Sequence, residues 1–225
     1  MPARHGSSVS DGLTRLIEVM DRLRSPGGCP WDGEQTHESL APYALEETYE
    51  LLEAIETGSR EDLREELGDV LLQVVFHARL AQEHPEDPFG IQEVARAVAD
   101  KLVERHPHVF EGADGDAPLS PQETLNRWDE IKKRTKQRES VMDGIPVAQP
   151  ALARAQKVLS RAERAGLDVP LPGGVELEAQ LLALAARAQA EGVDAEAALR
   201  EATREYENAA REAESATAVT QRPAT

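Results

Sequence analysis

The sequence predicts an all-α protein, a helical bundle with no β-sheet. In every strong segment the apolar residues recur with a helical period, and no stretch alternates apolar and polar residues for long enough to form a strand. Of the 225 residues, 4% are aromatic and 30% are charged. This balance is typical of long amphipathic helices rather than of sandwiches or barrels.

The charge and the apolar content disfavour several classes of protein. Lys and Arg number 25 and Asp and Glu number 42, which gives a net charge of −17, a poor surface for neutralising the phosphates of a nucleic acid. The longest apolar run, Val70–Phe76, is interrupted by Gln73 and falls far short of the ~20 residues that span a bilayer. The single cysteine, Cys29, permits no internal disulfide and fits a reducing compartment. We expect a cytoplasmic protein that binds neither membranes nor nucleic acid.

Five helices are expected in the first part of the chain. They cover about residues 10–23, 38–56, 60–83, 91–105 and 121–138, with loops at 25–32, 84–89 and 106–119 between them. Ser10, Ser59 and Ser120 are capping residues, and Pro121 stands at the first helical position. Pro42 is tolerable within the second helix only if it lies in the first turn.

The second part is expected to hold a linker and two or three Ala-rich helices. The linker covers residues 141–150, and the helices cover about 151–165, 176–191 and 194–215. Residues 10–140 then form one helical domain and 151–215 a second, with flexible ends at 1–9 and 216–225.

The two parts share an outline that suggests a tandem repeat. A long helix, a break and a second helix run from Leu71 to Arg105, and a shorter version, broken at Gly192, runs from Leu181 to Arg211. The shorter version carries none of the paired acidic residues described next, which makes it a degenerate copy. The alternative is that all Ala-rich helices look alike.

The helix over 38–56 carries its acidic residues on one arc. Glu46, Glu47, Glu50 and Glu53 share this arc, with Glu47 and Glu50 one turn apart. The opposite arc is the expected core face, formed by Leu45, Tyr49, Leu51, Leu52 and Ile55. Taken alone, the acidic arc fits a solvated surface.

The next helix changes that interpretation. Asp62, Glu66, Asp69 and Gln73 form a narrow polar stripe, and from Val70 onward nearly everything else is apolar, which indicates burial. Buried carboxylates are rare unless they are paired or bind metal. The short Thr57-Gly58 break makes the two helices antiparallel neighbours, so their acids can converge on a hard-oxygen site for Mg²⁺ or Mn²⁺. The alternatives are an acidic surface, or a di-iron bundle, for which Glu34-Gln-Thr-His37 is one weak match.

The combination Glu46-Glu47-x-x-Glu50 and Glu66-x-x-Asp69 resembles the MazG family of nucleoside triphosphate pyrophosphohydrolases. Three further segments are similar to that family: residues 28–37 (Gly-Cys-Pro-Trp-Asp, then Gln-Thr-His), 101–110 (Lys, then Arg-His-Pro-His-Val-Phe) and 126–132 (Asn-Arg-Trp, then Ile-Lys). The similarity is strong over about 10–138 and thinner to about 215.

The resemblance implies an all-α homodimer that cleaves a nucleoside triphosphate between the α- and β-phosphates, releasing a monophosphate and pyrophosphate in nucleotide-pool sanitation. Glu47, Glu50, Glu66 and Asp69 would be the Mg²⁺ ligands, and Glu46 would help to hold a second metal ion or the attacking water. The second copy departs from this pattern. Glu205 and Ala209 stand where the first copy has Lys101 and Arg105, so the second copy is interpreted as structural.

Cations and aromatic residues are candidates for substrate binding. Lys101 and Arg105, one turn apart, are placed to clamp the β- and γ-phosphates, although cations are also favourable near a helix C-terminus. Lys132 is a candidate phosphate contact. Trp31 and Trp128 are candidates for contact with the base, with core packing as the alternative for both.

Two other functions remain open from the sequence. One is a catalytically silent helical dimer that binds nucleotides or protein partners, and the other is a narrow-substrate relative such as a dUTPase-like or phosphoribosyl-ATP-cleaving bundle. A homodimer is expected in each case, because two antiparallel helices cannot bury both of their apolar faces alone.

Overall fold

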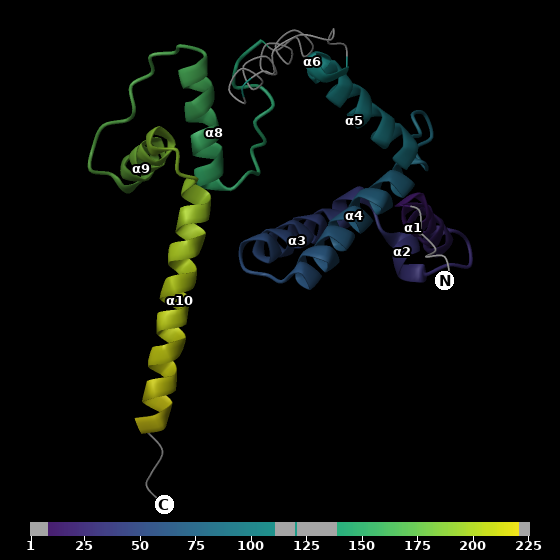
Figure 1. Ribbon diagram of the computed structural model, residues 1–225, viewed down its shortest axis with the longest axis horizontal. Helices are drawn as coiled ribbons and strands as arrows, with labels where there is room; N and C mark the ends of the chain where they lie inside the picture. Colours follow the sequence, from purple (N-terminus) through teal and green to yellow (C-terminus); the bar gives the residue numbers. More distant parts are fainter. Residues whose placement is uncertain (1–8, 111–119, 121–138, 221–225) are drawn as a thin grey trace, which may run out of the picture. The chain divides into compact units, whose positions relative to one another are not determined.

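The computed structural model describes residues 9–110, 120 and 139–220 (Figure 1). Within these ranges every regular element is helical and no strand occurs, which confirms the all-α prediction. None of the described helices is long and apolar enough to cross a membrane.

The chain divides into two compact units, residues 1–127 and 128–225. The first holds α1 (Val9–Arg24), α2 (Pro30–Glu34), α3 (His37–Glu56), α4 (Arg60–Ala81), α5 (Ile91–Arg105) and α6 (Pro107–Phe110). The second holds α8 (Ala151–Arg164), α9 (Leu177–Glu191) and α10 (Ala195–Thr220). The predicted helix over 121–138 lies outside the described residues.

The α3–α4 hairpin is set by its caps and its turn. Ser59 accepts hydrogen bonds from the N–H groups of Glu61 and Asp62, and Asp62 closes a capping box by accepting from the N–H of Ser59 at 2.6 Å. A Cβ atom at Gly58 would lie 2.7 Å from the backbone of Ala54. The turn therefore requires a residue without a side chain, and α4 returns directly along α3.

The core of the first unit forms where α1, α3 and α4 meet. Met20 and Leu40 are 1% exposed, and they pack with Val75, Phe76 and Leu80 of α4. Around them lie the half-buried side chains of Leu16, Ile17, Leu72 and Ile91. This core fixes α4, the helix that carries most of the candidate acidic site.

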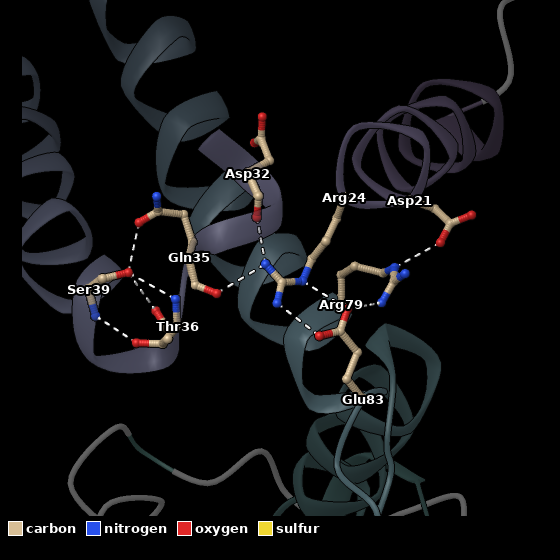
Figure 2. Close-up of polar contacts among 8 residues, drawn as sticks. All are labelled: Asp21, Arg24, Asp32, Gln35, Thr36, Ser39, Arg79 and Glu83. Atoms are coloured by element: carbon tan, nitrogen blue, oxygen red, sulfur yellow. Dashed lines mark hydrogen bonds and ion pairs between the residues drawn. The ribbon is translucent and has the colours of Figure 1, made fainter. Parts of the chain in front are cut away.

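A charged network ties the segment around α2 to α1 and α4 (Figure 2). The Arg24 side chain is 8% exposed and pairs with Glu83 at 2.8 Å. The same guanidinium donates to the backbone carbonyl oxygens of Asp32 and Gln35 at 2.5 and 3.0 Å. Arg79 bridges Glu83 and Asp21 at 2.9 and 2.7 Å. Arg24 thereby joins the segment that precedes α3 to the residues just after the C-terminus of α4.

The second unit is held by small residues and by polar side chains that bond to backbone. Of its described residues, Ala179 and Ala185 are buried. Gln156 of α8 donates to the carbonyl oxygen of Val193 at 2.7 Å and accepts from the N–H of Ala195 at 2.8 Å. These two bonds fix the corner between α9 and α10.

Several details differ from the sequence predictions. Residues expected in loops form the short helices α2 and α6, with Pro30 at a first helical position that suits proline. The tail expected from 216 continues α10 to Thr220. Pro42 lies in the second turn of α3 rather than the first, because the Thr36 cap starts that helix at His37.

The expected core face of α3 is wrong in part for a single chain, although Leu51 and Leu52 of that face are half-buried. Leu45, Tyr49 and Ile55 are 56%, 46% and 62% exposed, while the buried residues of this helix are Leu40 and Ala54. On α4, Leu71 and Val74 are likewise exposed. These exposed side chains leave an apolar face of the α3–α4 hairpin uncovered in a single chain.

Candidate metal centre

Three of the predicted ligands meet between α3 and α4. Glu47 comes from α3, and Glu66 and Asp69 come from consecutive turns of α4. One carboxylate oxygen from each lies within 4.8 Å of the others, and all three residues are half-buried. The antiparallel hairpin brings them together because Glu47 lies about as far before the turn as Glu66 and Asp69 lie after it.

The pKa shifts show that these acids repel one another. Partial burial raises the pKa of Glu47, and the negative charges of Asp69 and Glu50 raise it further. Partial burial likewise raises the pKa of Glu66, with added repulsion from Glu50 and Asp69. Within the described part of the chain, no Lys or Arg forms an ion pair with the three carboxylates. A divalent cation fits this donor set, because it supplies the missing positive charge to oxygen ligands.

Glu50 and Glu46 are placed less centrally. Glu50 is exposed and lies outside the group of three, yet its charge acts on both Glu47 and Glu66. Glu46 is exposed on α3. The ligand role predicted for Glu50 and the auxiliary role predicted for Glu46 stay predictions.

The polar stripe of α4 continues beyond the acids. Gln73, one turn after Asp69, is 9% exposed, and its buried Oε1 has no hydrogen-bond partner in the described structure. One turn further, His77 stacks on His37 of α3, with ring centroids 5.0 Å apart and Nδ1 atoms 2.7 Å apart. Sequence reasoning missed this pair, although His77 continues the four-residue spacing of the stripe from Gln73.

The other predicted contacts are not assembled around the acids. Trp31 of α2 is half exposed and meets Tyr43 of α3 edge to face, with ring centroids 6.0 Å apart. Lys101 and Arg105 lie on α5, which contacts α4 and α6 but not α3 among the described elements. Trp128 and Lys132 lie outside the described residues.

Comparison with known proteins finds a family model that covers the acidic α3–α4 hairpin. The family model described as the MazG nucleotide pyrophosphohydrolase domain matches residues 35–110, the segment from the α3 cap through α6. A nucleoside triphosphate pyrophosphohydrolase/pyrophosphatase MazG from Thermotoga maritima is 40% identical over 85% of this chain and 81% of its own length. The chain belongs to the MazG family.

Two further matches are a curated relative and a solved structure. A nucleoside triphosphate pyrophosphohydrolase from Mycolicibacterium smegmatis is 46% identical over 93% of this chain. The MazG chain described here spans 61% of the length of that relative. The crystal structure of a mazG-related protein from Thermotoga maritima is 29% identical and covers 53% of this chain and 98% of its own, with a TM-score of 0.44.

Proposed function

We propose that this MazG-family chain is an Mg²⁺-dependent nucleoside triphosphate pyrophosphohydrolase that cleaves between the α- and β-phosphates. The observation that carries the proposal is the convergence of Glu47, Glu66 and Asp69 from facing helices. Repulsion among them has no compensating cation in the described chain, which is a cost that a protein retains where the charges bind something. The names of the relatives give the substrate class.

The acidic residues divide into holding and proton-accepting roles. Glu47, Glu66 and Asp69 hold the cation, and Glu50, one turn from Glu47, completes the set. When bound, such an ion supplies Lewis-acid chemistry to phosphate and water. Glu46, exposed beside Glu47, is the carboxylate that accepts the proton from the attacking water. Mn²⁺ can replace Mg²⁺ because it accepts the same hard oxygen donors.

Basic and aromatic residues supply the rest of the substrate site. Lys101 and Arg105 neutralise the charge that develops on the departing pyrophosphate, as bidentate and point-charge contacts do for phosphates. Trp31 covers the base, and Arg24 positions Trp31 by holding the carbonyl oxygens of Asp32 and Gln35. In this proposal Trp128 and Lys132 add contacts to the base and to a phosphate.

The active form is a homodimer. The α3–α4 hairpin exposes Leu45, Tyr49 and Ile55 on one helix and Leu67, Leu71 and Val74 on the other. Exposed apolar side chains gathered on two adjacent helices mark an interface. A second hairpin laid on this face would complete a four-helix bundle.

Pyrophosphate release from a panel of ribo- and deoxynucleoside triphosphates tests the function. We expect turnover with Mg²⁺ and none in chelator, with a monophosphate as the second product. Orthophosphate in place of pyrophosphate contradicts cleavage between the α- and β-phosphates. Binding of nucleotide without turnover by the metal-loaded protein instead supports the silent dimer, and turnover of a single nucleotide supports the narrow-substrate relative.

A further inference from the structure

A pair of histidines lies beyond the acids on the α3–α4 hairpin. His37 begins α3 and is exposed, while His77 lies near the end of α4 and is half-buried. Their rings are parallel to within 3°, with centroids 5.0 Å apart and Nδ1 atoms 2.7 Å apart. The centroid separation equals the distance between the nitrogens plus the two ring radii, so both nitrogens lie between the rings. Two nitrogen ligands from facing helices therefore meet at one point near solvent.

The chemistry of the contact suits a metal ion. In it one Nδ1 carries a proton and the other offers a lone pair, and among the described residues neither ring forms a hydrogen bond to any other group. Burial lowers the pKa of His77, with the charge of His37 adding to the shift. His77 is therefore neutral at neutral pH, and neutral imidazole is the commonest metal ligand of proteins.

An ion between the rings leaves the proton count unchanged. The ring that donates in the contact moves its proton from Nδ1 to Nε2 through water. Both Nδ1 atoms then offer a lone pair to the ion, and both rings remain neutral. The ion takes the place of the shared proton, and no proton is released to solvent.

The spacing of the two nitrogens selects the geometry of the ion. Imidazole nitrogens lie about 2.0–2.1 Å from a bound transition metal. Two such nitrogens are about 2.9 Å apart when they meet the ion at a right angle, and about 3.3 Å apart at the tetrahedral angle. The observed separation is 2.7 Å. A tetragonal ion such as Ni²⁺ or Cu²⁺ therefore needs a smaller movement of the rings than tetrahedral Zn²⁺ does.

The imidazoles are separate from the acidic centre. His77 follows Asp69 by eight positions on α4, which is about 12 Å along the helix. The group formed by Glu47, Glu66 and Asp69 includes neither histidine. The donors also differ in kind, because Mg²⁺ prefers oxygen and imidazole suits the later transition metals. One hairpin thus offers places for two chemically different divalent ions.

We propose that His37 and His77 form a second metal site, in which their Nδ1 atoms bind one tetragonal divalent ion such as Ni²⁺. In the described part of the chain no His, Cys, Asp or Glu joins them in a group of three donors, so water fills the remaining positions. The ion links the first turn of α3 to the last turns of α4, at the opposite end of the hairpin from Gly58. It closes the hairpin there, and its binding does not depend on the proposed reaction.

Calorimetric titration of the full chain, prepared without a histidine tag, tests the site. The titration is made in excess Mg²⁺, which occupies the oxygen donors of the acids. We expect one Ni²⁺ per chain, bound more tightly than Zn²⁺. His37→Gln changes an exposed residue and should weaken Ni²⁺ binding by about 100-fold or more, since loss of even an outer partner of a metal ligand costs about 10–100-fold.

The matched control removes the other neighbouring pair of rings. His106 and His108 have centroids 5.7 Å apart and are tilted by 46°, and Nδ1 of His106 lies 2.6 Å from the carbonyl oxygen of Leu102. His106→Gln with His108→Gln should leave the affinity for Ni²⁺ unchanged. Circular dichroism establishes that each variant keeps its helices.

Two further measurements identify the ligands and separate this site from the acidic one. The electron paramagnetic resonance spectrum of the wild-type chain with one Cu²⁺ should show coupling to two imidazole nitrogens, and His77→Gln should leave one. Ni²⁺ should raise the thermal midpoint of the wild type and of Glu66→Gln, but not of His37→Gln, because ligand binding to the folded state stabilises it. The response of Glu66→Gln holds even if the chain hydrolyses no nucleotide.

Several results would overturn the proposal. One is the absence of Ni²⁺ binding in excess Mg²⁺, and another is equal affinity for Ni²⁺ in the wild type and His37→Gln. Loss of binding in the control with His106 and His108 replaced would place the ion elsewhere. Tighter binding of Zn²⁺ than of Ni²⁺ would contradict the tetragonal geometry.

Discussion

The two units of the chain differ in the side chains that meet between their helices. In the first, the α3–α4 hairpin buries part of three carboxylates that repel one another. In the second, the buried described residues are Ala179 and Ala185 of α9, and no such acidic group forms among the described residues. The polar contacts of the second unit, such as those of Gln156, end on backbone atoms.

This difference separates stabilising polar groups from functional ones. A side chain that satisfies a backbone donor or acceptor stabilises the fold in both units. Acids that raise one another's pKa lower the stability of the fold, which marks them as a candidate functional site. Substitutions made in pairs, with one in each unit, test this difference.

The largest expected effect is on turnover. Asp69→Asn in the first unit should lower pyrophosphate release by about 100-fold or more, because it removes one charge from the group that holds the cation. Glu205→Gln in the second unit should leave the rate unchanged. Circular dichroism and size exclusion establish that both variants keep their helices and mass. Equal losses of pyrophosphate release from the two substitutions would contradict a functional difference between the units.

Arginine removal should affect the two units unequally. Arg24→Ala breaks a nearly buried ion pair and two hydrogen bonds to carbonyl oxygens, and should cost about 2–3 kcal/mol in the free energy of unfolding. Arg161→Ala removes bonds to the carbonyl oxygens of Val141 and Asp143 and should cost about 1–2 kcal/mol. Urea unfolding measures both. Arg24→Lys should recover only part of the lost free energy of unfolding, because an ammonium group cannot contact Glu83 and both carbonyl oxygens in the geometry of the guanidinium. Full recovery by lysine would show that only the positive charge of Arg24 matters.

Mild acid should destabilise the first unit selectively. Burial lowers the pKa of His77 below its usual 6.5, with the charge of His37 adding to the shift. The unfolded chain then binds the proton more readily, so stability is complete above pH 6.5 and falls as pH drops through that value. All six histidines precede residue 128. Calorimetry from pH 7.5 to 5.5 should show the loss in the first unit, and His77→Gln should reduce it. A parallel loss in the second unit would refute this assignment.

The smallest effect concerns the acids without their ion. Glu66 has a raised pKa in the fold, caused first by burial and then by Glu50 and Asp69. The folded state therefore binds the proton more tightly, and stability falls as pH rises through the raised pKa. In chelator at pH 7.5, Glu66→Gln should slightly raise the thermal midpoint while abolishing turnover. Added Mg²⁺ should raise the midpoint of the wild type and not of the variant.

The local structure of the site followed from sequence because its causes are local. Ser59 and Asp62 cap α4, Gly58 closes the turn, and the three- and four-residue spacing places Glu66 and Asp69 on one face. Helix α5 was predicted with its observed bounds, Ile91–Arg105. Each of these depends on residues within a few positions of one another.

The predictions failed where the packing of a side chain depends on residues far away in the sequence or on a second chain. Periodicity identified Leu45, Tyr49 and Ile55 as one apolar arc but could not tell a core within the chain from an interface between chains. The pairing of His37 with His77 joins residues forty positions apart, and the four-residue spacing that leads to His77 does not point to His37. The position of Lys101 and Arg105 relative to the acids depends on the angle at which α5 leaves α4, which helical period does not encode.

The spacing of the acids between α3 and α4 depends on the absence of a side chain at Gly58. Alanine there would strike the backbone of Ala54 at 2.7 Å, with no flexible side chain available to yield. Relief would require α4 to shift or rotate relative to α3, and the separation of Glu47 from Glu66 would change with it. Gly58→Ala would thus lower the affinity of the acidic site for a cation by changing the spacing of its carboxylates, although residue 58 is not itself one of those acids.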